Sequence, residues 1–162
     1  PWPSGTPMSM PELRHAHLMT MTLQVDFAGM LGIGKTPAGR RRIAPVLGGT
    51  FTGDKLAGTV LPGADWVVNR PDGVMLIDVR LTLRTAWESL IYLSYQGRFL
   101  ADAEAMQRFG KGEVLAPSDY SLAVIARFES GDDRLAWLND AVCVGTGTQT
   151  ATGPVYDFFT VG

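Results

Sequence analysis

Apolar and polar residues alternate along much of the chain with the period of two that is typical of β-strands. The alternation is clearest in VMLIDVRLTLRT (residues 74–85), where aliphatic residues alternate with Asp78, Arg80, Thr82 and Arg84. Similar patterns predict further strands over residues 17–27, 40–53, 54–61, 64–70, 88–97, 120–130, 140–147 and 154–161.

Turn signals separate these strands. Pro71-Asp72-Gly73 predicts a hairpin turn, and the glycine- and proline-rich residues 29–39 predict a loop. Eight or nine short strands with turns between them indicate an antiparallel sandwich or barrel.

One segment has helical rather than strand character. Residues 101–109 predict a short helix, with Asp102 as its N-cap and Gly110 just after its end. Residues 132–139 predict a turn or a short helix. The expected fold is therefore all-β, with one short helix.

Composition narrows the class of protein. The 162 residues suit one domain, and the 19 glycines and 10 prolines favour many turns. The net charge of −2 gives no general argument for a nucleic acid partner, and no apolar run is long enough for a membrane span. The single cysteine, Cys143, excludes an internal disulfide and fits a cytoplasmic protein. Residues 1–13 are expected to be a disordered segment or a remnant of cloning, and residues 14–162 to be a single barrel domain.

One short motif suggests a nucleotide site and is rejected. GMLGIGKT (Gly29–Thr36) fits the P-loop pattern, and Val74–Asp78 mimics the apolar strand that often accompanies it. A P-loop needs a helix whose N-terminus faces the phosphates. The residues after Thr36 include Gly39 and Pro45 and are a poor helix, so no ATP-dependent activity is expected.

Other reactive residues have ordinary explanations. His15 and His17 share a strand face, but no third ligand is suggested nearby, so no metal is expected. The run of arginines at residues 40–42 cannot form one patch on a strand, because alternate side chains point to opposite faces. Cys143 lies in an apolar strand and is expected to be a small core residue.

The charges of residues 74–85 leave two interpretations open. Asp78, Arg80 and Arg84 share one strand face, and Tyr92 shares a face with Ser94 and Gln96 on the next strand. This face is either the wet outside of a sheet or the polar lining of a barrel that holds a ligand.

Six segments stand in a fixed order along the chain. They are TPAGRRRIAPVLGGTFTG, LPGADWVVNRPDGV, DVRLTLRT, LIYLSYQG, ARFESGDDRLAWLN and VGTG. From about Leu18 to the C-terminus, the chain resembles the domain-of-unknown-function 3237 family in these motifs. The resemblance implies a single antiparallel β-barrel of roughly 150 residues with one short helix, and it implies no reaction. The chain departs from the family pattern at Thr85–Tyr92, where an Asp-Gly turn is usual.

With this resemblance, we expect a pocket inside the barrel. The motif residues that carry over are Arg42, Gly48, Gly49, Asp65, Trp66, Arg70, Asp78, Arg80, Tyr92, Arg127, Phe128, Glu129, Trp137, Leu138 and Asn139. Asp78 and Glu129 are expected to be structural. The expected catalytic residues are Asp65 as general base, with Arg80 and Tyr92 holding an oxyanion. The expected substrate-binding residues are Trp66, Tyr120, Arg127, Trp137 and Asn139.

The sequence thus predicts an enzyme without a cofactor that isomerises, cyclises or cleaves a small apolar or aromatic carbonyl compound. The alternative is a barrel of the same kind that binds a small hydrophobic ligand without catalysis. The expected partner is that ligand, with neither nucleic acid nor membrane, and homo-oligomer formation is left open.

Overall fold

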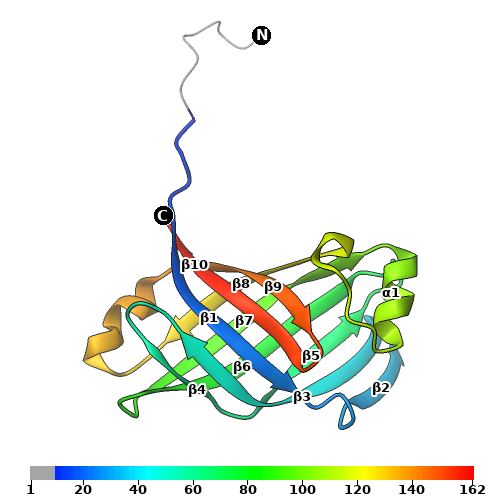
Figure 1. Ribbon diagram of the computed structural model, residues 1–162, viewed down its shortest axis with the longest axis horizontal. Coiled ribbons are helices and arrows are strands. Elements are labelled where there is room, and N and C mark those ends of the chain that lie inside the picture. The colour runs from blue at the N-terminus through cyan, green and yellow to red at the C-terminus, as the bar shows by residue number, and fades with distance from the viewer. Residues whose placement is uncertain (1–9) are drawn as a thin grey trace, which may run out of the picture.

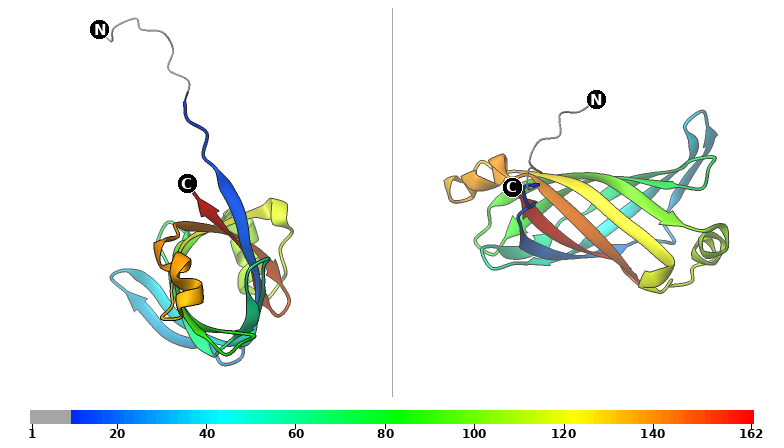
Figure 2. Two further views of the ribbon diagram at one scale, coloured as in Figure 1. Left: turned by 90° about the vertical axis from the view of Figure 1, so that its left-hand side faces the viewer. Right: turned by 90° about the horizontal axis from the view of Figure 1, so that it is seen from above.

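The strands form a closed antiparallel β-barrel (Figures 1 and 2). Alternate apolar side chains along these strands are buried and form the core. The computed structural model describes residues 10–162. In chain order, the elements are β1 (His15–Val25), β2 (Leu31–Thr36), β3 (Gly39–Thr52), β4 (Ala57–Val60), β5 (Gly63–Asn69), β6 (Met75–Thr85), β7 (Leu90–Ala101), α1 (Ala103–Gly110), the 3-10 helix η1 (Pro117–Asp119), β8 (Tyr120–Glu129), the 3-10 helix η2 (Asp133–Asp140), β9 (Cys143–Thr150) and β10 (Gly153–Val161).

The barrel closes because β1 pairs with both β10 and β3. From β6 to β10 each strand pairs with the next, and β3 returns to β6 through β4 and β5. These two short strands occupy one position, since β5 pairs with the first half of β3 and β4 with its second half. The all-β barrel predicted from the sequence is therefore confirmed, with eight strand positions around the ring.

The hairpin of β2 and β3 corrects one prediction. Residues 31–36 were expected to be a loop, but they pair with β3 as an exposed strand that leaves the barrel wall. Their glycines weaken the strand signal, and pairing with β3 overrides it. A turn and then β3 follow Thr36, so the predicted absence of a helix after Lys35 is confirmed.

The predicted short helix is also confirmed. In α1, Asp102 is the N-cap, and its side chain accepts a hydrogen bond of 2.8 Å from the backbone N–H of Ala105. The helix continues to Gly110, and the glycine with a left-handed φ, of 87°, is Gly112 rather than Gly110. Among residues 10–162, no helix is long and apolar enough to cross a membrane.

The helices α1 and η2 lie at opposite ends of the barrel (Figure 1). At the η2 end, Leu135 and Leu138 are buried, and they join a core that contains Leu83, Ile91 and Leu93. This end of the barrel is filled by side chains.

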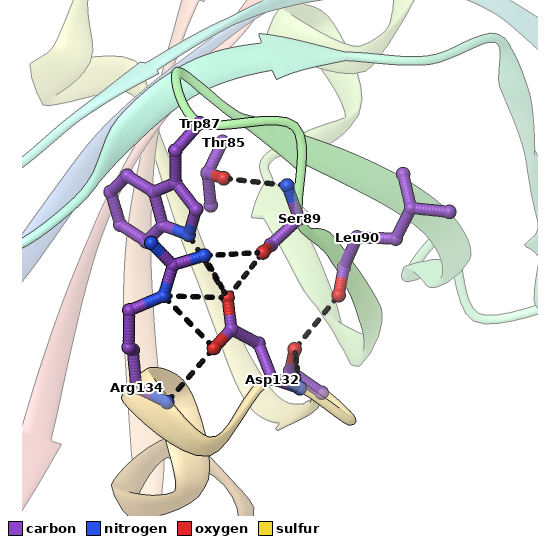
Figure 3. A network of polar contacts seen from close by, with 7 residues as sticks. Thr85, Trp87, Ser89, Leu90, Asp132 and Arg134 are labelled. Atoms are coloured by element: carbon purple, nitrogen blue, oxygen red, sulfur yellow. Dashed lines mark hydrogen bonds and ion pairs between the residues drawn. The ribbon is translucent and has the colours of Figure 1, made fainter.

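A polar network fastens η2 to the turn between β6 and β7 (Figure 3). Asp132 caps η2 through the backbone N–H of Arg134, and it accepts hydrogen bonds from Trp87 Nε1 (3.0 Å) and Ser89 Oγ. Arg134 pairs with the same carboxylate at 2.8 Å, and these donors hold the pKa of Asp132 well below its usual range. The network is a structural clasp that keeps this end of the barrel closed.

The prediction for residues 1–13 falls mostly outside the described residues, which begin at Met10. Residues 10–13 have no regular secondary structure and are exposed. The barrel seam begins close by, where Arg14 exchanges two backbone hydrogen bonds of 3.0 Å with Gly162.

Candidate functional site

A cavity of about 440 Å³ lies inside the barrel, toward the α1 end. This size is within the usual range for small-molecule sites, roughly 300–1,000 Å³. The lining is Leu23, Val25, Phe27, Met30, Arg42, Ala44, Val46, Asp65, Val67, Met75, Ile77, Val79, Tyr95, Phe109, Gly110, Gly112, Glu113, Val114, Gln149, Thr150, Ala151, Pro154 and Tyr156. Most of these side chains are apolar, so the few polar ones determine what the cavity can bind.

The inward face of β6 shows where the cavity ends. Met75, Ile77 and Val79 line it, whereas Leu81 and Leu83, further along the same face, belong to the packed core. The cavity therefore occupies the half of the barrel that opens toward α1, and buried core side chains pack in the half near η2.

Aromatic rings separate the two halves. Tyr95 and Tyr156 line the cavity, with ring centroids 5.0 Å apart, and both pack on Phe158 in the core. Glycines of β9 make room for these rings: a Cβ at Gly147 would come within 2.9 Å of the Tyr156 ring, and one at Gly145 equally close to Phe158. Burial raises the pKa of both tyrosines, so they remain protonated donors at neutral pH.

Asp65 is the carboxylate of the cavity. It belongs to β5, where its side chain points inward while that of Trp66 points outward. The β5–β6 ladder is interrupted after Asp65↔Val79 and resumes at Val68↔Leu76. In the gap, the Asp65 carboxylate accepts the backbone N–H of Asp78 at 3.1 Å. The carboxylate is thereby fixed in place, and its side chain still borders the cavity.

The surroundings of Asp65 favour its neutral form. Burial raises its pKa to about 7, from an ordinary value of 3.8. The Asp78 carboxylate adds to the rise, while the hydrogen bond from the Asp78 backbone and the charge of Arg42 oppose it. The residue keeps some open area, and because it lines the cavity we assign that area to the cavity rather than to bulk solvent. Asp65 can therefore accept or donate a proton near neutral pH.

Arg42 is the cation of the cavity. It points inward from β3, and its Nη2 donates a hydrogen bond of 2.6 Å to Asn69 Oδ1. Weak contacts of 3.7 Å join the guanidinium to the sulfur atoms of Met30 and Met75. Arg41, the next residue toward the N-terminus, instead donates to the Trp66 carbonyl oxygen at 3.0 Å. The alternation expected for this run of arginines is thus present, and only Arg42 of the three lines the cavity.

Four of the predicted site residues lie outside the barrel, which corrects their assignment. Arg80 on β6, Tyr92 on β7 and Arg127 on β8 are exposed. In each strand buried and more exposed residues alternate, and these three belong to the set that faces outward. Trp66 also faces outward, and the Arg80 guanidinium lies over its ring at 5.6 Å. The charged face of β6 is therefore the wet outside of the barrel, and Asp78 and Glu129 lie on this outside as well.

The other three predicted binding residues have structural contacts. The Tyr120 hydroxyl accepts the backbone N–H of Gln149 at 2.7 Å, and its ring stacks on Phe99. The Asn139 side chain forms two hydrogen bonds with the backbone of Ser130, at 2.8 and 3.0 Å. Trp137 belongs to η2, at the end away from the cavity, where Lys55 lies over its ring. None of the three lines the cavity.

Of the predicted catalytic and substrate-binding residues, Asp65 alone lines the cavity, together with three side chains that had not been given either role. These are Arg42, Tyr95 and Tyr156. A signal for the tyrosines was present, because each is a polar-tipped residue on the otherwise apolar face of its strand.

Metal ligands do not gather in the part of the chain that the structure describes. Within residues 10–162, no three histidine, cysteine or acidic side chains converge. His17 instead contacts Asp157 at 3.0 Å on the outer face, where Thr20 donates to the same carboxylate oxygen at 2.6 Å.

Comparison with known proteins identifies similar chains. The family described as "Protein of unknown function (DUF3237)" matches residues 11–161. A UPF0311 protein of Bradyrhizobium diazoefficiens is 29% identical over 148 residues, which is 91% of this chain and 95% of that protein.

Solved structures share the barrel. The conserved protein of unknown function RPA1785 from Rhodopseudomonas palustris superposes with a TM-score of 0.89 at 27% identity, over 94% of this chain and 100% of that one. A β-barrel-like protein from Acinetobacter baumannii reaches 0.81 at 31% identity, over 95% and 99%. An enzyme from Penicillium herquei reaches 0.71 at 16% identity, over 96% and 99%, which shows a shared fold only.

Proposed function

The chain belongs to the DUF3237 family, and we propose that its barrel cavity catalyses proton transfer on a small, largely apolar carbonyl compound. One observation carries the proposal. Asp65, whose pKa is raised to about 7, borders an apolar cavity of about 440 Å³ that also contains the guanidinium of Arg42. A base, a cation and tyrosine hydroxyls around one cavity are the components of enolisation chemistry.

The proposed step begins when Asp65 removes a proton from a carbon next to the substrate carbonyl. The C–H electron pair forms the enolate, and its oxygen is stabilised by Arg42 and by a tyrosine hydroxyl, from Tyr95 or Tyr156. The protonated Asp65 then returns the proton to another carbon of the enolate. Atoms and electrons balance, and the product is an isomer of the substrate. Cyclisation or retro-aldol cleavage would use the same base and the same oxyanion contacts.

The near-neutral pKa of Asp65 suits both halves of this cycle. A carboxylate with an ordinary pKa is a weak base, whereas one near 7 abstracts a proton more readily and is still ionised in a large fraction of molecules at neutral pH. The apolar lining strengthens the attraction between Arg42 and the enolate oxygen, because the effective dielectric constant is lower than in water.

The fold is compatible with catalysis. The Penicillium herquei protein is described as an enzyme, and it shares this architecture. At 16% identity its reaction does not transfer to this chain, so the argument depends on the residues of this cavity.

A ligand-binding barrel without catalysis is the second candidate. It is favoured by the apolar character of the lining, since such a cavity binds hydrophobic molecules whether or not they react. The two functions differ in their dependence on Asp65. Replacing its charge abolishes proton transfer, but it leaves the binding of a neutral apolar molecule largely intact.

The location is a separate proposal. Cys143, the single cysteine, is buried, and burial raises the pKa of its thiol to about 11, which makes it unreactive. A chain with one inert thiol suits the cytoplasm, and we retain this location as a prediction.

The Kemp elimination of 5-nitrobenzisoxazole tests the proposed function without knowledge of the natural substrate. In this reaction a base removes the ring C–H proton, the N–O bond breaks, and a coloured nitrile-bearing phenolate forms. We expect catalysis by the wild-type protein, with a rate that rises with pH and has its midpoint near 7. Asp65→Asn should lower the rate by roughly a hundred- to ten-thousand-fold. Glu129→Gln, an exposed carboxylate on the outer face, is the matched control and should retain full activity.

Binding measured on the same samples separates the two candidates. If Asp65→Asn binds the probe normally but does not turn it over, proton transfer at Asp65 is supported. If wild-type protein binds the probe and gives no rate above that of Asp65→Asn, the barrel is a binding protein and the proposed function is wrong.

A further inference from the structure

The guanidinium of Arg42 uses only part of its hydrogen-bonding capacity within the protein. Its Nη2 has a strong acceptor in Asn69, but among residues 10–162 its buried Nε has no hydrogen-bond partner. The remaining contacts of the guanidinium are sulfur atoms of Met30 and Met75, which are weak acceptors. A buried N–H without an acceptor costs free energy, and it is rare unless a ligand or water completes it.

The charge of Arg42 is neutralised only in part, by the nearby carboxylate of Asp65. Within residues 10–162, Arg42 forms no ion pair, although it borders a largely apolar cavity. Burial lowers its pKa, and the nearby charge of Arg40 acts in the same direction, while Asp65 opposes them. A cation beside an apolar cavity costs folding free energy unless an anion binds next to it.

We propose that the natural ligand carries a carboxylate, which pairs with the guanidinium of Arg42 where it borders the cavity, while the apolar body of the ligand fills the cavity beside Tyr95 and Tyr156. This deepens the proposed function, on which it rests, by naming the substrate class: a small apolar or aromatic carbonyl compound that also carries a carboxylate. One oxygen suffices for the contact, because Asn69 already occupies Nη2.

The charges around the cavity set the pH at which an anion binds best. The titratable side chains of the lining are Arg42, Asp65, Tyr95, Glu113 and Tyr156. Glu113 is paired with Arg108 at 3.3 Å, and both tyrosines have raised pKa values. Asp65 is therefore the group that changes the cavity charge near neutral pH. When it is protonated the Arg42 charge is unopposed, so a carboxylate binds more tightly below pH 7 than above it.

The experiment compares 2-naphthoate with 2-naphthamide, which has nearly the same shape and no charge. Isothermal titration calorimetry on the wild-type protein at pH 6 should show the carboxylate binding roughly 10- to 100-fold more tightly, as expected for a hydrogen bond to a charged group. This comparison requires no mutant. Equal affinities, tighter binding of the amide, or binding of neither compound would overturn the proposal.

Variants assign the preference to Arg42. Arg42→Gln should remove it, Arg42→Lys should keep part of it, and the outer-face control Arg80→Gln should leave it unchanged. If folded Arg42→Gln still prefers the carboxylate, the contact is elsewhere and the inference is wrong. Asp65→Asn should keep the preference and lose its dependence on pH.

The outcomes distinguish this inference from the proposed function. A Kemp rate that depends on Asp65, together with no preference for the carboxylate, overturns only the substrate class. A preference that depends on Arg42, together with a Kemp rate unaffected by Asp65→Asn, overturns only the proton-transfer function.

Discussion

Replacing Asp65 with asparagine should stabilise the protein at high pH. Burial raises the pKa of Asp65 to about 7 in the folded chain, from 3.8 in the unfolded chain. Below pH 3.8 the residue is protonated in both states and has no linkage effect on stability. As pH rises from 3.8 to 7, the unfolded chain releases the proton and the folded chain keeps it, so the free energy of unfolding falls. Above pH 7 the loss is complete.

The size of the effect follows from the pKa difference. A shift of about 3 pH units corresponds to roughly 4 kcal/mol of lost stability above pH 7, and to about 1 kcal/mol at pH 4.5. Asparagine removes this loss because it does not ionise. Its side-chain oxygen can still accept the backbone N–H of Asp78, which holds Asp65 at 3.1 Å. The variant should therefore be more stable than the wild type by about 4 kcal/mol at pH 9 and by about 1 kcal/mol at pH 4.5.

Urea denaturation followed by tryptophan fluorescence measures the difference. With a slope of about 2 kcal/mol/M for a chain of this size, the midpoint at pH 9 should rise by about 2 M. Glu129→Gln provides the control and should show no such dependence on pH. If the stability difference between Asp65→Asn and wild type is the same at both pH values, or if the variant is less stable than wild type at pH 9, then the pKa of Asp65 is not raised in the folded protein.

Three further substitutions test the packing at Gly147, the backbone conformation of Glu88 and the outward position of Arg80. Gly147→Ala should destabilise the fold by about 1–3 kcal/mol in urea denaturation, because its Cβ would press on the Leu122 side chain and then on the ring of Tyr156; unchanged stability would contradict that packing. Glu88→Gly should raise the melting temperature and increase the free energy of unfolding by about 0.5–1 kcal/mol, because Glu88 has a left-handed φ of 72° that glycine adopts without strain. The exposed ion pair of Glu88 with Arg84, at 3.8 Å, contributes little stability, so its loss costs little. A lower melting temperature would contradict this prediction. Arg80→Met should leave Kemp activity unchanged because this side chain lies outside the barrel, and a loss of ten-fold or more would place it back in the site.

The sequence predicted the barrel because period-two alternation survives in nearly every strand. It failed at Leu31–Thr36, where alternating glycines weaken the pattern and pairing with β3 determines the structure. It also could not show that β4 and β5 share one position between β3 and β6, since this depends on pairing between residues far apart in the chain.

The site was predicted less well, for a reason of geometry. Alternation sorts residues into two faces but does not say which face is inside when both carry polar groups. The charged face of β6 was partly assigned to the pocket, although Ile77 and Val79, on its opposite face, line the cavity. Asp65 does line the cavity, and its role as a base stays a prediction. Its inward direction separates it from Trp66, the neighbour with which it had been grouped.

The departure from the family pattern at Thr85–Tyr92 has a visible consequence. This segment includes the turn between β6 and β7, and Glu88 adopts there the left-handed conformation that glycine prefers. Trp87 and Ser89, on either side, instead bind Asp132 of the clasp at the η2 end (Figure 3). The turn is thus held by side-chain contacts, at the end of the barrel away from the cavity.

A crystal structure of the protein with 5-nitrobenzotriazole would show whether Asp65 is placed to act as the catalytic base. This compound resembles the Kemp substrate but does not react, and its ring N–H occupies the place of the proton that the base removes. We expect the aromatic ring to lie in the cavity at the α1 end of the barrel, with a ring nitrogen within about 3 Å of the Asp65 carboxylate. A ring bound elsewhere on the protein, or bound in the cavity with its nitrogens directed away from Asp65, would contradict the claim that Asp65 is the catalytic base.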